Sequence, residues 1–140
     1  MRRSLALAAL VVAAACTGGG VGVPAAETVP TVPFEQSSLV INVSSQSYDR
    51  DEVRMRVEVD DRLLADREFA TGSGHNVLSL PVDLAPGAHR VTVRADDGTT
   101  LDLPLHLPDQ RRWLEIAYWS GGEEGRHFTH ELFDHTPGGG

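Results

Sequence analysis

The sequence predicts an all-β fold, an antiparallel β-sandwich of about eight strands, forming a single domain after a disordered tether. Three observations lead to this prediction. From residue 38 onward, apolar and polar side chains alternate with a period of two, the pattern of strands that bury one face. Short groups of turn-forming residues separate the alternating runs. No run has the three-to-four-residue apolar spacing of an amphipathic helix.

The first half of the domain contributes four expected strands, at residues 39–43, 53–59, 63–69 and 78–84. The second is the most regular, and its alternation places Val57 in the core and Arg56 on the surface. Asp60 and Asp61 form the short turn before the third strand. Because Pro81 has no backbone N–H, we expect the fourth strand to lie at a sheet edge or to bulge there.

The second half contributes four more expected strands, at residues 89–95, 101–107, 114–118 and 126–133. The fifth strand begins after a proline–glycine turn, and its Val91 is expected in the core. Asp97-Gly98 is a strong hairpin signal before the sixth strand. Pro104 again indicates an edge strand or a bulge. A polar, glycine-rich loop at residues 120–125 separates the last two strands.

The amino end has the composition of an export signal. Arg2 and Arg3 form a short basic start, and residues 5–15 are all apolar. This run is too short to cross a membrane, which takes about 20 apolar residues. We therefore expect residues 1–15 to be a signal peptide.

Cys16 is the only cysteine and lies where such a signal would be cut. The segment Ala13-Ala14-Ala15-Cys16 resembles the lipobox of bacterial lipoproteins, with alanine at 13 where leucine is most common. The resemblance implies that Cys16 is lipidated, becomes the first residue of the mature chain and anchors it to the cell membrane on the extracytoplasmic side. The alternative is ordinary cleavage near Ala15, which would leave a free thiol. A single cysteine excludes an intrachain disulfide, so the domain must be held together by packing.

The remaining boundaries follow from composition. Residues 16–36 are rich in glycine, proline and small side chains, which predicts a flexible tether that would hold the domain about 25 Å from the anchor. Residues 37–135 form the expected sandwich, and residues 136–140 a flexible tail.

The net charge argues against two classes of partner. The 12 basic residues include Arg2 and Arg3, so ten basic and 20 acidic residues remain after signal removal. A chain this acidic is not expected to bind nucleic acid through the phosphate backbone, or to adhere to an anionic lipid surface by charge.

No arrangement of residues indicates catalysis, a metal or a cofactor. The segment at residues 71–74 contains a serine but lacks the glycine that a nucleophile elbow needs two positions before it. His127 and His130 have an odd spacing, so they point to opposite faces of a strand and do not chelate together. Acidic residues gather at the turns, where we expect them to bind backbone amides; a calcium site is the alternative. His75 and Asn76, at the end of the loop at residues 71–74, could either cap it or bind a ligand.

The seventh strand carries the main candidate ligand surface. Its core-facing residues are expected to be Leu114, Ile116 and Tyr118. The residues out of phase with these are then directed outward: Trp113, Glu115 and Trp119. The opposite assignment would bury Glu115 without a partner, which is costly. Exposed aromatic rings near a carboxylate suit sugar binding. Alternatively, the rings pack under loops or under the carboxy-terminal tail.

These features predict a membrane-anchored, exported binding or interaction module at the cell envelope, with an envelope protein or a glycan as its partner. The layout of short strands resembles immunoglobulin-like and carbohydrate-binding sandwich modules in architecture alone. A carbohydrate-binding module for envelope glycans is therefore the second hypothesis. A small envelope enzyme is the third, and it would need a deep pocket with convergent polar groups.

Overall fold

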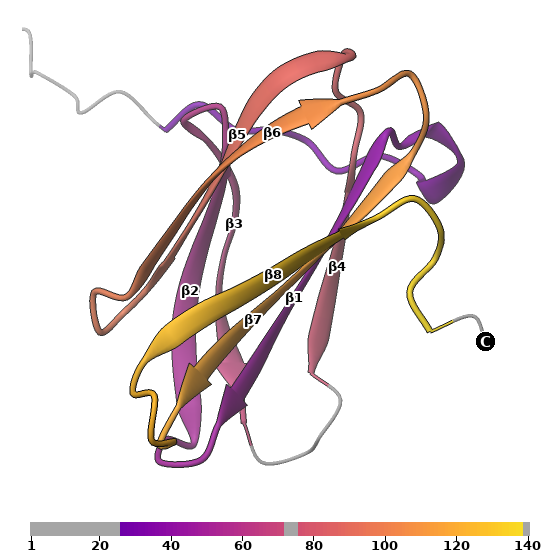
Figure 1. Ribbon diagram of the computed structural model, residues 1–140. Helices are drawn as coiled ribbons and strands as arrows, with labels where there is room; N and C mark the ends of the chain where they lie inside the picture. The colour runs from indigo at the N-terminus through magenta and orange to yellow at the C-terminus, as the bar shows by residue number, and fades with distance from the viewer. Residues whose placement is uncertain (1–25, 72–75, 139–140) are drawn as a thin grey trace, which may run out of the picture.

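The computed structural model describes residues 26–71 and 76–138. Two four-stranded sheets pack face to face, which confirms the all-β sandwich (Figure 1). The elements are the 3-10 helix η1 (Phe34–Gln36) and the strands β1 (Leu39–Ser47), β2 (Glu52–Val59), β3 (Arg62–Ala70), β4 (Val77–Val82), β5 (Gly87–Ala95), β6 (Thr100–Leu107), β7 (Arg112–Ser120) and β8 (His127–Phe133). Among these residues, no helix is long and apolar enough to cross a membrane. The expected signal peptide and Cys16 lie outside the described residues.

The first sheet has the order β4-β1-β7-β8 and the second has the order β3-β2-β5-β6. The alternation of side chains predicts antiparallel pairing throughout, but β1 and β7 run parallel, with Leu39 opposite Arg112 and Ser47 opposite Ser120. The other strand pairs are antiparallel. One-sided alternation is typical of antiparallel sheets, but it reports which face of a strand is buried and does not fix the direction of each neighbour. A single parallel pair therefore could not be read from the pattern.

The core lies between the sheets and is formed by the inward-facing positions of both. Val57 and Val91 have no exposed surface, which confirms their expected burial. The largest side chain in the core is Tyr118, whose ring contacts Phe128 edge-on at 5.4 Å between centroids. Each fully buried valine or leucine contributes about 1.5–3 kcal/mol relative to an exposed one, so this packing can hold the domain without a disulfide.

Both prolines expected at edges lie there. Pro81 is in β4, at one edge of the first sheet, and Pro104 is in β6, at one edge of the second. An edge strand leaves alternate N–H groups unpaired, so a residue without this group is tolerated, and it also discourages pairing with another chain.

The segment at residues 27–32 corrects the expected length of the tether. The backbone N–H of Val29 donates to the Leu63 carbonyl at 2.8 Å, and the N–H of Leu63 donates to the Glu27 carbonyl at 2.8 Å. The N–H of Val32 donates to the Pro81 carbonyl at 3.0 Å, and the Val29 side chain is only 6% exposed. This segment therefore joins the edge strand β3 to the edge strand β4. The folded domain begins near residue 27 rather than 37, because two open strand edges offer backbone partners and the Val29 side chain packs into the core.

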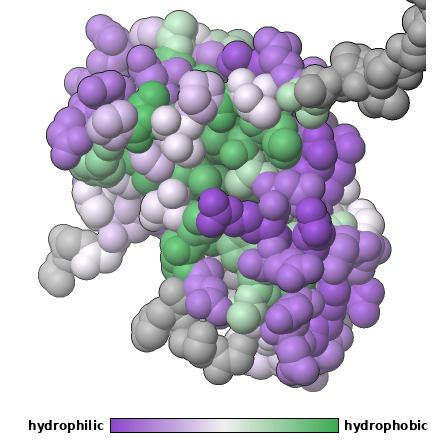
Figure 2. All heavy atoms as spheres, turned by 180° about the vertical axis from the view of Figure 1, so that it is seen from behind, coloured by the Kyte–Doolittle hydropathy of each residue, from purple (hydrophilic) through white to green (hydrophobic). Residues whose placement is uncertain are grey.

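Apolar side chains of β4 also lie near the surface, next to this segment. Val77 is one of the exposed large hydrophobic residues, and Leu78 is partly buried against the core. From behind, apolar side chains gather in the middle of the molecule between polar margins (Figure 2).

Candidate functional site

The outer face of the β4-β1-β7-β8 sheet holds the three residues that sequence reasoning selected on the seventh strand. Leu114, Ile116 and Tyr118 are buried in the core, which confirms their expected orientation. The three residues out of phase with them are half-buried on the opposite side of the strand: Trp113, Glu115 and Trp119. Register places β8 residues beside them on the same face, namely Phe133, Glu131, Thr129 and His127.

Trp113 lies at the η1 end of this face and is partly covered. Its ring is 6.4 Å from the ring of Phe34 in η1, and the Arg111 guanidinium lies 4.4 Å above that Phe34 ring. Thr136 and Pro137 line the same hollow as Trp113, so the carboxy-terminal segment lies against the domain up to that point rather than forming a free tail from 136. This end of the face matches the alternative in which a tryptophan packs under the tail.

Trp119 lies at the other end of the face, beside two further rings. The Tyr48 ring is 6.4 Å away and 76% of Tyr48 is exposed. The His127 ring is 6.5 Å from Trp119 and nearly parallel to it, at 10°. The indole N–H donates to the Thr129 hydroxyl at 3.0 Å, which fixes the ring's orientation on the sheet. The three rings thus form one continuous aromatic surface.

These rings line a hollow of about 390 Å³ that also reaches the β7–β8 loop. We call it the Trp119 hollow, and its principal lining residues are Tyr48, Trp119, Glu123, Glu124, His127 and Thr129. The Glu124 carboxylate is 3.4 Å from Nε2 of His127. The hollow therefore combines an aromatic floor with acidic residues on its rim.

A strip of polar side chains lies between the two aromatic ends of the face. Asn42 donates from Nδ2 to Oε1 of Glu115 at 2.6 Å and accepts a hydrogen bond from the Ser79 hydroxyl at 2.7 Å. Glu131 stands directly opposite Glu115 in the β7–β8 register. Because these groups lie on an outer face, their remaining donors and acceptors are accessible to a ligand.

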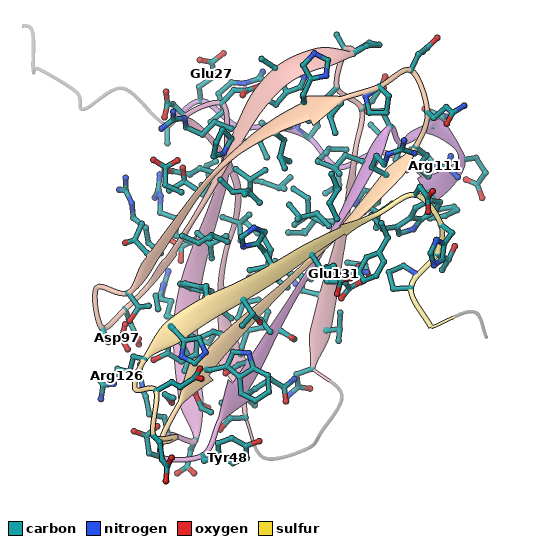
Figure 3. The ribbon with its side chains drawn as sticks, viewed as in Figure 1. Glu27, Tyr48, Asp97, Arg111, Arg126 and Glu131 are labelled. Atoms are coloured by element: carbon teal, nitrogen blue, oxygen red, sulfur yellow. The ribbon has the colours of Figure 1, made fainter. Side chains whose placement is uncertain are left out.

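A network of ionic side chains holds the loops beside the Trp119 hollow, and two of its members, Asp97 and Arg126, lie close together in Figure 3. Arg50 binds both carboxylate oxygens of Asp96, at 2.7 and 2.8 Å. The Tyr118 hydroxyl, reaching out of the core, donates to Asp97, whose side chain is 7% exposed and has Arg126 at 3.5 Å.

Two pKa shifts report on this network. Burial opposes ionisation of Asp97, but the hydrogen bonds from the Tyr118 hydroxyl and the Thr99 amide outweigh it and hold the Asp97 pKa below its usual value. Burial, followed by the neighbouring Asp97 carboxylate, raises the pKa of Tyr118. The tyrosine therefore remains a neutral donor to an ionised carboxylate.

Gly121 allows the β7–β8 loop to pack against the β1–β2 loop. Its φ is +80°, and a Cβ at this position would lie 3.0 Å from the Asp49 backbone nitrogen and 3.1 Å from Cβ of Tyr48. Any larger residue would meet both steric and backbone strain here. The glycine thus sets the position of Tyr48 beside Trp119.

The outer face of the second sheet has a different character. Three of its arginines are paired with nearby carboxylates: Arg54 with Asp66 at 2.8 Å, Arg56 with Glu58 at 2.7 Å, and Arg90 with Asp102 at 2.8 Å. These surface pairs satisfy each other's charges and contribute little to stability. The aromatic face is therefore the stronger candidate site.

The polar pair His75 and Asn76 is not brought to the Trp119 hollow. His75 lies outside the described residues. Asn76 donates from Nδ2 to the Ala70 carbonyl and lines a separate hollow with Phe69 and Val77. In the described segments, no group of three or more histidine, cysteine or acidic side chains could hold a metal ion.

Sequence reasoning did not find Tyr48, Glu123 or Glu124 as site residues. Tyr48 follows β1 directly and reaches Trp119 only because β1 pairs in parallel with β7, which places Ser47 opposite Ser120. The one available signal was the presence of polar loops after both strands.

No protein-family model matches the sequence, and no curated protein or solved structure is significantly similar to it.

Proposed function

We propose that this chain is an exported protein, lipidated on Cys16, whose sandwich domain binds a ligand through the outer face of the β4-β1-β7-β8 sheet. The observation that carries the binding proposal is the Trp119 hollow, where Tyr48, Trp119 and His127 form an accessible aromatic surface. A sandwich needs its inner face for stability, and nothing in its packing requires an aromatic cluster on the outer one.

The position of the first described residues supports display of this site. Glu27 lies at the end of the sandwich opposite Tyr48 (Figure 3). A nine-residue strand such as β1 spans about 30 Å, so the Trp119 hollow is separated by about that distance from the segment that leads to Cys16. The hollow and the segment that leads to Cys16 therefore lie at opposite ends of the described domain, which would keep the hollow clear of an anchor on Cys16.

A glycan is the ligand class that the face fits best. Sugars stack their apolar ring surfaces on aromatic side chains and bond their hydroxyls to carboxylates and amides. The face offers the ring of Trp119 followed by the polar strip of Glu115, Asn42 and Ser79. A protein partner remains the second candidate, favoured by the exposed Tyr48 ring, because tyrosine and tryptophan are enriched in protein interfaces.

The anchor is tested by the mass of the protein purified from membranes of an expressing bacterium. We expect a chain that begins at Cys16 and carries lipid, and we expect Cys16→Ser to release the domain or stall processing. An unmodified mature chain that partitions into the aqueous phase of a detergent extraction would contradict the anchor.

The binding proposal is tested on a glycan array with the purified full chain. We expect Trp119→Ala to abolish binding and to retain the fold by circular dichroism. The matched control is Val77→Ala. This change truncates an exposed apolar residue on a different strand, β4, and the variant should bind as the parent does. Capture of no glycan by the parent chain, together with capture of an envelope protein that depends on Tyr48, would favour the second candidate.

A further inference from the structure

We infer that the Trp119 hollow binds a positively charged ammonium group of its ligand, as found in a sugar with a free amine or in a quaternary amine. This inference rests on the proposed binding function of the same face. It names the chemistry of the group that would occupy the hollow.

The aromatic surface is the first observation that points to a cation. Trp119 and Tyr48 lie 6.4 Å apart with a 38° angle between their planes, so both rings border the same space. The faces of tryptophan and tyrosine carry negative electrostatic potential and attract cations that come within about 6 Å of the ring centre. Tryptophan is the most effective side chain for this purpose.

The charges around the hollow are the second observation. Glu123 and Glu124 line it from the β7–β8 loop, and both are exposed. None of its lining residues is an arginine, and the sequence has no lysine. The nearest arginine along the chain, Arg126, directs its Nε toward Asp97 at 3.5 Å. The local field therefore favours a cation and disfavours an anionic ligand.

The alternative of a bare metal ion fits these residues less well. Calcium and magnesium take six or more oxygen ligands in a compact shell, whereas this hollow offers two exposed carboxylates over an aromatic floor. An alkylammonium has both parts that the hollow matches, because its charge is spread over apolar carbon groups that can contact rings.

The test measures tryptophan fluorescence of the full chain at pH 7, where most of the amine of glucosamine is protonated, and at constant ionic strength during titration with three probes. These are glucosamine, its neutral counterpart glucose, and tetramethylammonium chloride. A Trp113→Phe background leaves Trp119 as the single emitter, since the sequence has two tryptophans. A carboxylate pair together with a cation–π contact should make glucosamine bind about fivefold to tenfold more tightly than glucose.

Two variants of matched charge separate the inference from general electrostatics. The double change Glu123→Gln and Glu124→Gln should remove the preference for glucosamine and leave glucose binding unchanged. The control double change, Glu52→Gln and Glu68→Gln, removes the same charge from exposed positions on β2 and β3 and should retain the preference.

Each outcome decides between the two proposals. Equal binding of glucose and glucosamine would overturn the ammonium inference and support the glycan site. Binding of tetramethylammonium without either sugar would support the ammonium inference and overturn the glycan proposal. Binding of none of the three probes would overturn both.

Discussion

Tyr118→Phe removes a single oxygen atom from the core and tests how the loops around the candidate site are held. The phenylalanine ring keeps the volume of the tyrosine ring and its edge-on contact with Phe128, so no cavity arises. What is lost is the hydrogen bond to Asp97, a carboxylate with only 7% of its side chain exposed. The variant leaves this carboxylate with fewer donors in a poorly solvated position.

The magnitude follows from the charge of the acceptor. Hydrogen bonds to charged groups contribute about 1.5–3 kcal/mol, and the arginines at 3.5 and 3.8 Å from Asp97 remain to stabilise it. We therefore expect a loss of about 2 kcal/mol in the free energy of unfolding. For a domain of this size, this corresponds to a fall in Tm of about 8–15 °C. Thermal and urea denaturation at pH 7 measure it.

Tyr48→Phe is the control, because it makes the same chemical change in a residue that is 76% exposed. We expect it to change the free energy of unfolding by less than about 0.5 kcal/mol. Since the pKa of Asp97 is lowered from 3.8 in the folded state, its contribution is present above that value and is lost as the pH falls through the folded pKa. The cost of Tyr118→Phe should accordingly shrink in acid. Equal costs for the two tyrosines, or a cost independent of pH, would refute the reasoning.

Three further predictions concern other parts of the fold. In thermal melts, Val57→Asp should lower the free energy of unfolding by several kcal/mol, because it places an unpaired charge in the core. Arg56→Asp should lower it only slightly, and equal tolerance of the two changes would contradict the assigned strand face. Asp61→Gly should raise the free energy of unfolding by about 0.5–1 kcal/mol in urea, since its φ of 62° strains a non-glycine residue. When protonated, His89 can donate from both ring nitrogens, to Asp60 at 2.7 Å and to the carbonyl of residue 85 at 2.6 Å, and the contact with Asp60 raises its pKa above 6.5. The contribution of this contact to the free energy of unfolding is complete below pH 6.5 and is lost as the pH rises through the folded pKa. We therefore expect the Tm of the parent to fall over this pH range, and His89→Ala to remove this part of the pH dependence.

The strands and their faces could be predicted because alternation is a local signal. The burial of Val57 and Val91, and the positions of Pro81 and Pro104 at sheet edges, follow from side-chain order and backbone chemistry within single strands. The outward direction of Trp119 follows in the same way from the phase of its own strand.

The features that escaped prediction depend on contacts between distant parts of the chain. Val29 lies in a proline-rich segment without alternation, and its burial depends on contacts of this segment with β3 and β4 that a local pattern cannot describe. Tyr48 reaches Trp119 through the parallel pairing of β1 with β7. Sequence reasoning thus found one ring of the candidate site and missed the loops that surround it.

The parallel pairing of β1 with β7 also determines the order in which the chain can fold. Partners on these strands, such as Asn42 and Glu115, are 73 positions apart, while the hairpins β2–β3 and β5–β6 close locally. The entropy of closing a long loop makes such distant pairing slow, so the local hairpins should form first. During synthesis, β1 must wait with one edge unpaired until Arg112–Ser120 has left the ribosome. The domain therefore stays unfinished until most of the chain exists, which gives any export machinery time to engage it before the sandwich closes.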